Sequence, residues 1–598
     1  MLRVSLLNNK NEWKDAVGIT GKRWINPTFI YLKDYYEYYS TYKDKVEWVI
    51  PTWQDLTFDE YVQWVLNSNL DVIGFGFYIW NAHRWVEVAN SVRKKNPNIL
   101  IIAGGPDIDF LDKEYAAMLE DSFDFVIKYD GEEPFRLLLD KLVENKPIQD
   151  IDGVYTIKDS TMIGQLDKVI TRRTTWYQEN SPILNNKQIL KDAFTEGHTL
   201  GQEIMITWGT TRGCPYKCAF CDWGVSDYLK VGKKNPKISK RELTFLALNG
   251  VSGISLEDAN WGMFNSDVDI SVHWSRLYKR YNMLYRENAS TSKNRKENVT
   301  KIIKIMAESG MLPRFAVGLQ DLDPNVLKYN DRPDLTWEEH QEVLRELAKY
   351  NLGKTSTQAM LILGMPGQTL TTLIETFCKL GESKLFDDYA VNPFLMLPGA
   401  PMNMPVLRKK YNVKHTLGYL QDEKVISTAR WEKDTSRVVF PVKFLTSCFS
   451  FSSKDYLEMI VMSNFITQFN IHFESVFDKG VDRRHFYTNF REISKQILGD
   501  FFTKTVAYLK YHFDNDYLHY HIESENFYLP LRDTSIVFLA IHKSDVTKYF
   551  KDEYDIDVQS NYKSFCTHYG FPTKVFFNYT PDQGIAIMKE IYNTVRRF

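Results

Sequence analysis

Strand-like apolar runs alternate with helical segments over much of this chain, and this alternation constrains the fold more than any other feature. In residues 1–150 the runs include DVIGFGFYIW (71–80) and ILIIAGGP (99–106), with a helical segment between them. Such alternation predicts parallel strands joined by helices in a doubly wound, Rossmann-like sheet. Ligands of such sheets bind beyond the carboxyl ends of the strands, which here read FYIWN, AGGPD and YDGEE.

A second alternating stretch begins near residue 203, after a polar segment with little periodicity (151–202) that predicts a connector. Its apolar runs end in polar or glycine- and proline-rich loops; they are 203–208, 253–260, 281–288, 314–323, 357–369 and 388–402. Six strands with helices between them predict a central, partial (β/α)6 barrel of TIM type over 203–415, with its chemistry at the strand C-termini. The aromatic, helix-like stretches that follow predict a mostly helical domain over 416–598.

Local helix signals agree with this outline. Thr57 and Glu60 predict a capping box at the start of one helix, and Thr336 and Glu339 predict another.

Composition excludes several functional classes. Apolar residues make up 44% of the 598 residues and charged residues 25%, as in ordinary globular proteins of several domains. The net charge of −2 argues against nucleic acid as a partner. Neither a long apolar run nor a secretory signal is evident, and six cysteines are too few for a disulfide framework. These features predict a cytoplasmic protein that does not associate with membranes.

Three of the six cysteines lie close together in RGCPYKCAFCDWG (212–224), at Cys214, Cys218 and Cys221. Structural zinc sites usually take four ligands, often as paired C-x-x-C motifs, and a disulfide would leave one thiol over. A cubane iron–sulfur cluster normally takes four thiolates, so three would leave one iron open to a small molecule. The spacing therefore favours a cluster. Cys378 has the helical spacing of a core residue, and Cys448 and Cys566 lack neighbouring ligand patterns.

The cysteine spacing, with Phe220 before the last cysteine, resembles the radical S-adenosylmethionine (SAM) superfamily. Three further stretches resemble its strand-two, strand-four and strand-five motifs, in order: SLEDANWGMF, VGLQDLDPNVLKYNDR and LILGMPGQT. The resemblance covers about 200–415. It implies a [4Fe–4S] cluster on the three cysteines, whose open iron binds SAM and whose electron cleaves SAM to a 5′-deoxyadenosyl radical.

The resemblance also implies SAM-binding residues: Phe220, Glu257, Asn288, Gln320, Gly364, Pro366 and Gly367. Phe220 would lie near the adenine, and the backbone of 364–367 would help to seat the adenosyl group. Plainer interpretations stay open, because the glycines also suit a strand-to-helix turn and the polar residues suit structural roles.

The N-terminal stretches DVIGFGFYIWN, IIAGGPD and KYDGEEPF resemble the cobalamin-binding domain that precedes many radical SAM barrels. The implied cobalamin-binding residues are Gly76, Tyr78, Trp80, Gly104, Gly105, Pro106 and Gly131. One departure concerns the cobalt ligand, because Asp-x-His-x-x-Gly is absent and His83 lies outside that pattern. Cobalt would then lack a protein imidazole, or the domain has lost the cofactor. We expect the strand ends at 76–81, 104–107 and 130–133 to converge on one face that points toward the cysteine loop.

Together these features predict a radical SAM enzyme that uses cobalamin to methylate an unactivated carbon of a small molecule or peptide, with a flavodoxin or ferredoxin as electron donor. Two alternatives stay open. One is a radical SAM enzyme for rearrangement or cyclisation, with or without cobalamin, and the other is an iron–sulfur redox sensor or binding protein. The substrate itself is not readable from the sequence.

Overall fold

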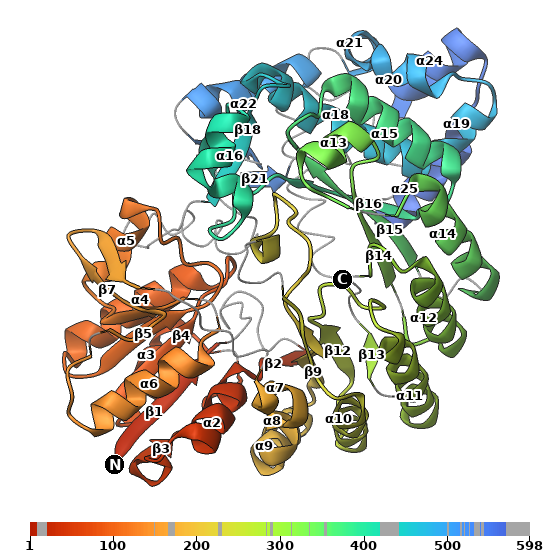
Figure 1. Ribbon diagram of the computed structural model, residues 1–598. Helices are drawn as coiled ribbons and strands as arrows, with labels where there is room; N and C mark the ends of the chain where they lie inside the picture. Colours follow the sequence, from red (N-terminus) through yellow and green to blue (C-terminus); the bar gives the residue numbers. More distant parts are fainter. Residues whose placement is uncertain are drawn as a thin grey trace.

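Figure 1 shows a computed structural model of the chain. It describes residues 1–8, 21–54, 56–128, 130–148, 150–165, 174–224, 230–282, 284–286, 291–312, 314–333, 335–351, 356–418, 442–498, 501–514, 517–518, 521–524, 527–530, 539 and 543–569.

The N-terminal region contains a seven-stranded sheet with the strand order β3-β1-β4-β5-β6-β7-β8. Five strands run parallel: β1 (Leu2–Leu7), β3 (Val46–Trp48), β4 (Val72–Gly76), β5 (Leu100–Gly104) and β6 (Phe125–Ile127). The predicted doubly wound sheet is confirmed. The antiparallel strands β7 (Val154–Lys158) and β8 (Thr161–Gly164) extend it into the segment predicted as a connector.

Helices cover both faces of this sheet. Successive residues of a strand point to opposite sides, so these apolar strands present side chains to helices on each face. Val4, Val72 and Ile102 pack toward α2 (Thr28–Tyr39) and α6 (Glu132–Val143). Leu7, Ile73 and Ile101 pack on the other side. The helices there are α3 (Phe58–Asn67), α4 (Ala82–Lys95) and α5 (Lys113–Glu120). The predicted capping box of α3 is present, since Thr57 and Glu60 exchange hydrogen bonds.

The central region contains two parallel sheets. The first has the order β13-β12-β9-β2 and the second β14-β15-β16. The strands are β2 (Lys22–Ile25), β9 (Glu203–Trp208), β12 (Gly253–Leu256), β13 (Tyr285–Arg286), β14 (Arg314–Gln320), β15 (Ser356–Leu363) and β16 (Asp388–Pro393). All six predicted strands are therefore present, but no pairing joins β13 to β14 within the described residues. A continuous partial barrel stays a prediction.

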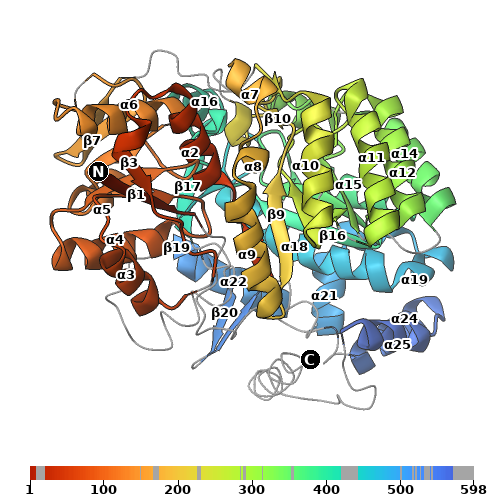
Figure 2. The same cartoon turned by 90° about the horizontal axis from the view of Figure 1, so that it is seen from below.

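Strand β2 was not predicted, and it connects the two halves of the molecule. The chain leaves the first sheet after β1, pairs with β9 through β2, and returns to the first sheet as α2. Helices α10 (Pro236–Leu248) and α11 (Asn265–Tyr281) pack against each other beside the central sheet. Figure 2 shows α8 (Pro182–Asn185) and α9 (Lys187–Thr199) between the N-terminal helices and α10.

The remaining elements of the central region are helices and one short hairpin. The helices are α7 (Thr175–Glu179), α12 (Lys296–Ser309), α13 (Pro324–Tyr329), α14 (Trp337–Asn351) and α15 (Leu370–Ser383). The capping box of α14 is present, since Thr336 and Glu339 exchange hydrogen bonds. The hairpin strands β10 (Thr211–Arg212) and β11 (Gly232–Lys233) flank the cysteine loop.

The C-terminal region is mostly helical where it is described, as predicted. Helix α18 (Ser453–His472) is buried along most of its length and packs on α15. The other elements are α16 (Pro405–Lys410), β17 (Lys414–Gly418), β18 (Val442–Ser447), α19 (Glu474–Asp478), α20 (Arg483–Thr488), α21 (Phe490–Leu498), α22 (Phe501–Asp514), β19 (Tyr517–Leu518), β20 (His521–Ser524), β21 (Phe527–Pro530), α24 (Lys543–Tyr554) and α25 (Gln559–Tyr569). Among the described helices, none combines the length and the apolar character needed to cross a bilayer. The predicted domain boundaries at 150, 202 and 415 stay predictions.

Candidate functional site

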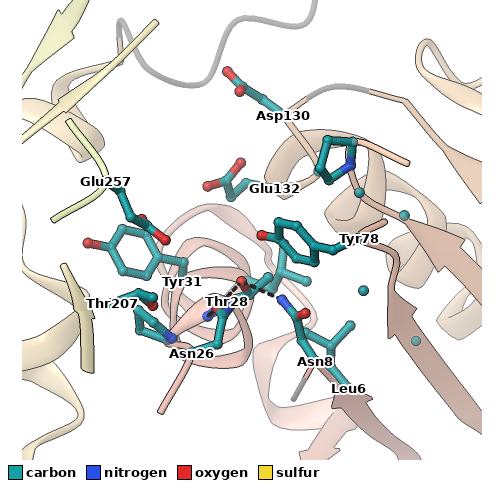
Figure 3. A pocket seen from close by; sticks show the side chains of 18 of the residues that line it. Leu6, Asn8, Asn26, Thr28, Tyr31, Tyr78, Asp130, Glu132, Thr207 and Glu257 are labelled. Carbon is teal, nitrogen blue, oxygen red and sulfur yellow. Dashed lines mark hydrogen bonds between the residues drawn. The ribbon is translucent and has the colours of Figure 1, made fainter. Parts of the chain in front are cut away.

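A cavity of about 690 Å³ lies between the N-terminal sheet and the central sheet (Figure 3). The residues predicted from the resemblance to cobalamin domains all line it: Gly76, Tyr78, Trp80, Gly104, Gly105, Pro106 and Gly131. Thr207 and Glu257 line it from β9 and the end of β12, and Asp222 and Trp223 line it directly after the last motif cysteine. The N-terminal strand ends therefore converge on one face, and that face reaches the cysteine loop.

The two glycines at the end of β5 differ in what surrounds them. A Cβ placed on Gly104 would meet only Ile127, at 3.8 Å, which is ordinary contact. Gly105 has φ +123°, and a Cβ there would lie 2.3 Å from the Phe77 carbonyl oxygen. Gly105 is therefore required by the backbone of the neighbouring loop, whereas Gly104, at the cavity wall, would accept a Cβ without a clash.

Two aromatic rings lie on the N-terminal side of the cavity. Tyr78 and Trp80 stack with their centroids 4.8 Å apart and their planes 13° from parallel. Burial raises the pKa of Tyr78, and the carboxyl of Glu257 raises it further. In Figure 3 Tyr78 and Glu257 project into the same space from opposite walls. His83, on α4, is not among the lining residues, and burial lowers its pKa to about 3.

Arg212 connects the cysteine segment to the N-terminal domain. Its guanidinium pairs with Glu132, in the first turn of α6, and lies 4.9 Å from the ring centroid of Tyr31 and 5.1 Å from that of Tyr177. Burial is the main cause that raises the pKa of Glu257, and Arg212 opposes that shift. Among the described lining residues, the carboxyl groups are those of Asp130, Glu132, Asp222 and Glu257, and Arg212 supplies a guanidinium.

A buried ion pair between Lys234 and Glu242 lies next to Tyr31, one of the residues that line the cavity. Lys234 Nζ donates to Glu242 Oε2 at 2.9 Å and to the hydroxyl of Tyr31 at 3.2 Å. The other hydrogen bonds to Glu242 come from Trp208 and Ser181, so its buried carboxylate is well satisfied.

The three motif cysteines are held in a tight loop. Cys214 and Cys218 are buried, and the amide of Cys221 donates to the carbonyl of Cys218 at 3.0 Å. Ala219 is fixed from both sides, because its amide donates to Asn330 O and its carbonyl accepts from the amide of Met402, each at 2.9 Å. The loop is therefore anchored to two distant segments.

The thiols of the loop lie close enough together to affect one another electrostatically. Burial raises the pKa of the Cys221 thiol to about 12, and the nearby Cys218 and Cys214 raise it further. A thiol in this environment stays protonated at neutral pH unless a metal replaces its proton. In the described residues no three His, Cys, Asp or Glu side chains converge as they would around a single ion. A cubane binds each thiolate at a different iron, so three cysteines in one loop are compatible with a cluster, and their role as its ligands stays a prediction.

The residues implied as SAM-binding come from several segments of the central region. Glu257 lines the cavity, whereas Phe220 packs edge-on against Phe394, at 6.4 Å between centroids. Gln320 ends β14 with φ +66°, a backbone conformation that non-glycine residues seldom adopt. Asn288 lies outside the described residues. The roles assigned to these four residues stay predictions.

The backbone of the loop after β15 is fixed by contacts with other parts of the protein. Gly364 and Gly367 have positive φ, and a Cβ on either would lie within 3 Å of Tyr456 or Tyr329, respectively. The Gly364 amide donates to Gln368 Oε1 and the Gly367 amide to Ser450 Oγ. These contacts support the plain-turn interpretation of both glycines. The carbonyl of Pro366 accepts from Asn330 Nδ2, and Asn330 also holds the cysteine loop.

Several residues at the site were not singled out in the sequence. They are Arg212, Asn260, Lys293 and Asn330. Asn260 and Asn330 do fall within the quoted motif stretches, but their neighbours carry the recognisable pattern. Lys293 lies in a polar stretch that resembles any loop.

Comparison with known proteins identifies the central region. Residues 208–377 match the Radical SAM superfamily, and this span contains the three cysteines and the strands β12 to β15. Residues 208–377 are a radical SAM domain. The resemblance predicted from the sequence is thereby confirmed.

Two relatives of this chain are methyltransferases by name. The chain is 26% identical over 351 residues to the cobalamin-dependent radical SAM methyltransferase TokK of Streptomyces tokunonensis, covering 58% of this chain and 50% of TokK. It is 27% identical over 339 residues to 2-(S-pantetheinyl)-carbapenam-3-carboxylate methyltransferase of Streptantibioticus cattleyicolor, covering 56% of this chain and 48% of the relative. The chain thus spans about half the length of these relatives.

Two solved structures share the fold of this chain. The cobalamin-dependent SAM radical enzyme OxsB superposes with a TM-score of 0.54 at 12% identity, over 100% of this chain and 84% of OxsB. The radical SAM methyltransferase TsrM of Kitasatospora setae gives a TM-score of 0.51 at 12% identity, over 83% of this chain and 100% of TsrM. These likenesses extend the fold comparison beyond the radical SAM domain to the N-terminal sheet.

Proposed function

We propose that this protein is a cobalamin-dependent radical SAM methyltransferase that acts on an unactivated carbon of a small molecule or peptide. Cys214, Cys218 and Cys221 would hold the [4Fe–4S] cluster, and the strand ends around Gly76, Gly104 and Gly131 would hold cobalamin. When bound, the cluster with SAM would supply a 5′-deoxyadenosyl radical, and methylcobalamin would supply the methyl group. Cofactors of this kind carry the chemistry, while the protein binds, orients and excludes water.

The observation that carries the proposal is the shared cavity. Its N-terminal wall consists of the strand ends expected to bind cobalamin, and its opposite wall includes Asp222 and Trp223, next to Cys221. A carbon that gives up hydrogen to the adenosyl radical must also meet a methyl donor. One cavity bordered by both regions provides that juxtaposition, which a redox sensor would not need.

The chain's own residues have defined parts in this proposal. The ion pair between Arg212 and Glu132 would hold the cysteine segment against the N-terminal region. Glu257 presents a carboxyl group to the cavity and can accept hydrogen bonds from a bound molecule. Tyr78 and Trp80 line the cavity and stack on each other, so their rings would form part of the surface that holds cobalamin.

The remaining parts of the proposal concern the setting. A one-electron donor such as a flavodoxin or ferredoxin would reduce the cluster. All five cysteines whose side chains are described are free thiols, which favours a reducing, cytoplasmic environment.

The test is an anaerobic incubation of reconstituted protein with hydroxocobalamin, a reductant, SAM labelled on its methyl carbon, and an extract of small molecules and peptides, so that any methyl group transferred comes from SAM. We expect 5′-deoxyadenosine and a labelled methyl group in a product. The Cys218→Ala variant should form neither, and protein without cobalamin should form no methylated product. 5′-Deoxyadenosine with an unlabelled, altered product would instead establish the rearranging or cyclising alternative. A wild-type protein that holds a cluster but cleaves no SAM would favour the sensor.

A further inference from the structure

A chain of polar contacts leads from a lysine to one of the motif cysteines. Lys293 Nζ donates to Asn260 Oδ1 at 2.8 Å, and Asn260 Nδ2 donates to Cys214 Sγ at 3.1 Å. Asn260 and Cys214 are only 4% and 3% exposed, so water does not compete for these contacts. Asn260 follows β12 and Lys293 precedes α12, so two separate elements meet at the thiol.

The lysine determines which end of the amide faces the sulfur. An ammonium group has three donors and no acceptor, so the atom of Asn260 that faces Lys293 must be the carbonyl oxygen. The amide nitrogen then faces Cys214 and can only donate to it. Without Lys293 the amide could rotate and turn its oxygen toward the thiolate, which would repel it.

The ammonium also lies within electrostatic reach of the whole cysteine loop. Burial has the largest effect on the pKa of Lys293 and lowers it, while Cys214, Cys218 and Cys221 oppose that shift. The ammonium lies 4.9 Å from the ring centroid of Tyr216, which belongs to the same loop. Its position therefore suits a cation that accompanies bound thiolates.

We propose that Asn260, oriented by Lys293, is a positioning residue that raises the reduction potential of the cluster through its N–H···S hydrogen bond to the Cys214 thiolate. This inference rests on the proposed function, because it requires the [4Fe–4S] cluster. Hydrogen bonds to cluster sulfurs are among the factors that set such potentials. The step concerned is the transfer of one electron from the protein's electron donor to the cluster. The reduced cluster carries one more negative charge, so a donor stabilises it more than the oxidised form.

The test is a redox titration, followed by electron paramagnetic resonance, of protein reconstituted anaerobically with iron and sulfide. The Asn260→Leu variant removes the donor, and we expect about a tenfold fall in the equilibrium constant for reduction. That fall lowers the midpoint potential by 59 mV for one electron. Lys293→Met should also lower the midpoint potential. Lys293→Arg keeps a cationic donor, so its midpoint potential should lie closer to that of wild type.

The matched control is Lys296→Met. Lys296 is three residues further along and pairs with Glu342, away from the cysteines, so its removal should leave the potential unchanged. If Asn260→Leu takes up no cluster, Asn260→Ala, which also removes the donor, takes its place, because Lys293→Met removes a charge as well as the contact that orients Asn260. Equal potentials in cluster-loaded wild type and the loaded variants would overturn this inference alone. Wild-type protein that takes up no iron and sulfide would overturn the proposed function and the inference with it.

Discussion

The two glycines after β5 allow cobalamin binding to be separated from folding. Replacing Gly104 by leucine adds a side chain to a backbone position where the first added atom meets only Ile127, at 3.8 Å. The new side chain must therefore extend along the cavity wall, and the protein itself should accommodate it. Replacing Gly105 by alanine should instead disturb the protein itself. The new Cβ would lie 2.3 Å from the Phe77 carbonyl oxygen, and φ is +123°.

The expected magnitudes follow from these contacts. Overfilling a packed site costs roughly 1–3 kcal/mol, and each 1.4 kcal/mol is tenfold in affinity, so Gly104→Leu should weaken cobalamin binding by roughly 10- to 100-fold. Its stability without cofactor should change little. Gly105→Ala should lower stability by about 1–3 kcal/mol through backbone strain alone.

The assay is cobalamin retained after gel filtration, read from its visible absorbance, beside thermal unfolding of the cofactor-free protein and its iron content after reconstitution. Gly104→Leu should lose cobalamin and keep its stability and iron. A folded Gly104→Leu protein that retains cobalamin as well as wild type does would refute the placement of the corrin at this wall. Wild-type protein that retains none would show that the domain no longer binds the cofactor.

Three further predictions concern the cluster and the buried charges. Cys214→Ala, Cys218→Ala and Cys221→Ala should each lose reconstituted iron, whereas Cys378→Ala, which alters a fully buried core residue of α15, should keep it; iron analysis decides. Lys234→Met should lower stability by about 3–5 kcal/mol because it leaves Glu242 charged and buried, and unchanged thermal unfolding would contradict this. Burial raises the pKa of Asp107 to about 8, with Asp109 and Asp222 adding to the shift, so the folded protein holds this proton more tightly than the unfolded chain does. The contribution of Asp107 to stability is therefore complete below its ordinary pKa and is lost as the pH rises toward 8. Asp107→Asn should remove that loss, and its stability relative to wild type, followed by thermal unfolding from pH 5 to 9, should rise up to about pH 8 and then level off.

Much of this protein was readable from local patterns. The capping boxes at Thr57 and Thr336 formed as predicted, because such motifs involve residues three positions apart. The strand ends that were expected to converge do so, because parallel strands place their carboxyl ends at one edge. The cysteine spacing predicted the family for a similar reason, since one short loop supplies all three thiols.

Other features depended on partners that are distant in the chain. The four-residue strand β2 is too short to show a period, and it exists because β9, about 180 residues later, offers an edge to pair with. Gly364 and Gly367 carry a recognisable motif, yet their contacts are with Tyr456, Tyr329 and Ser450. A motif shows that a backbone conformation is required, but not which neighbour requires it.

The sequence by itself thus determined most of the elements, their parallel direction and the three thiols, because periodicity, capping and spacing act over a few residues. Only the tertiary structure decided what surrounds those thiols and that one cavity joins the two sheets. Arg212 meets Glu132 across 80 residues, and Lys293 reaches Cys214 through Asn260. Such contacts leave no local pattern, since each partner looks like an ordinary polar residue until the fold brings them together.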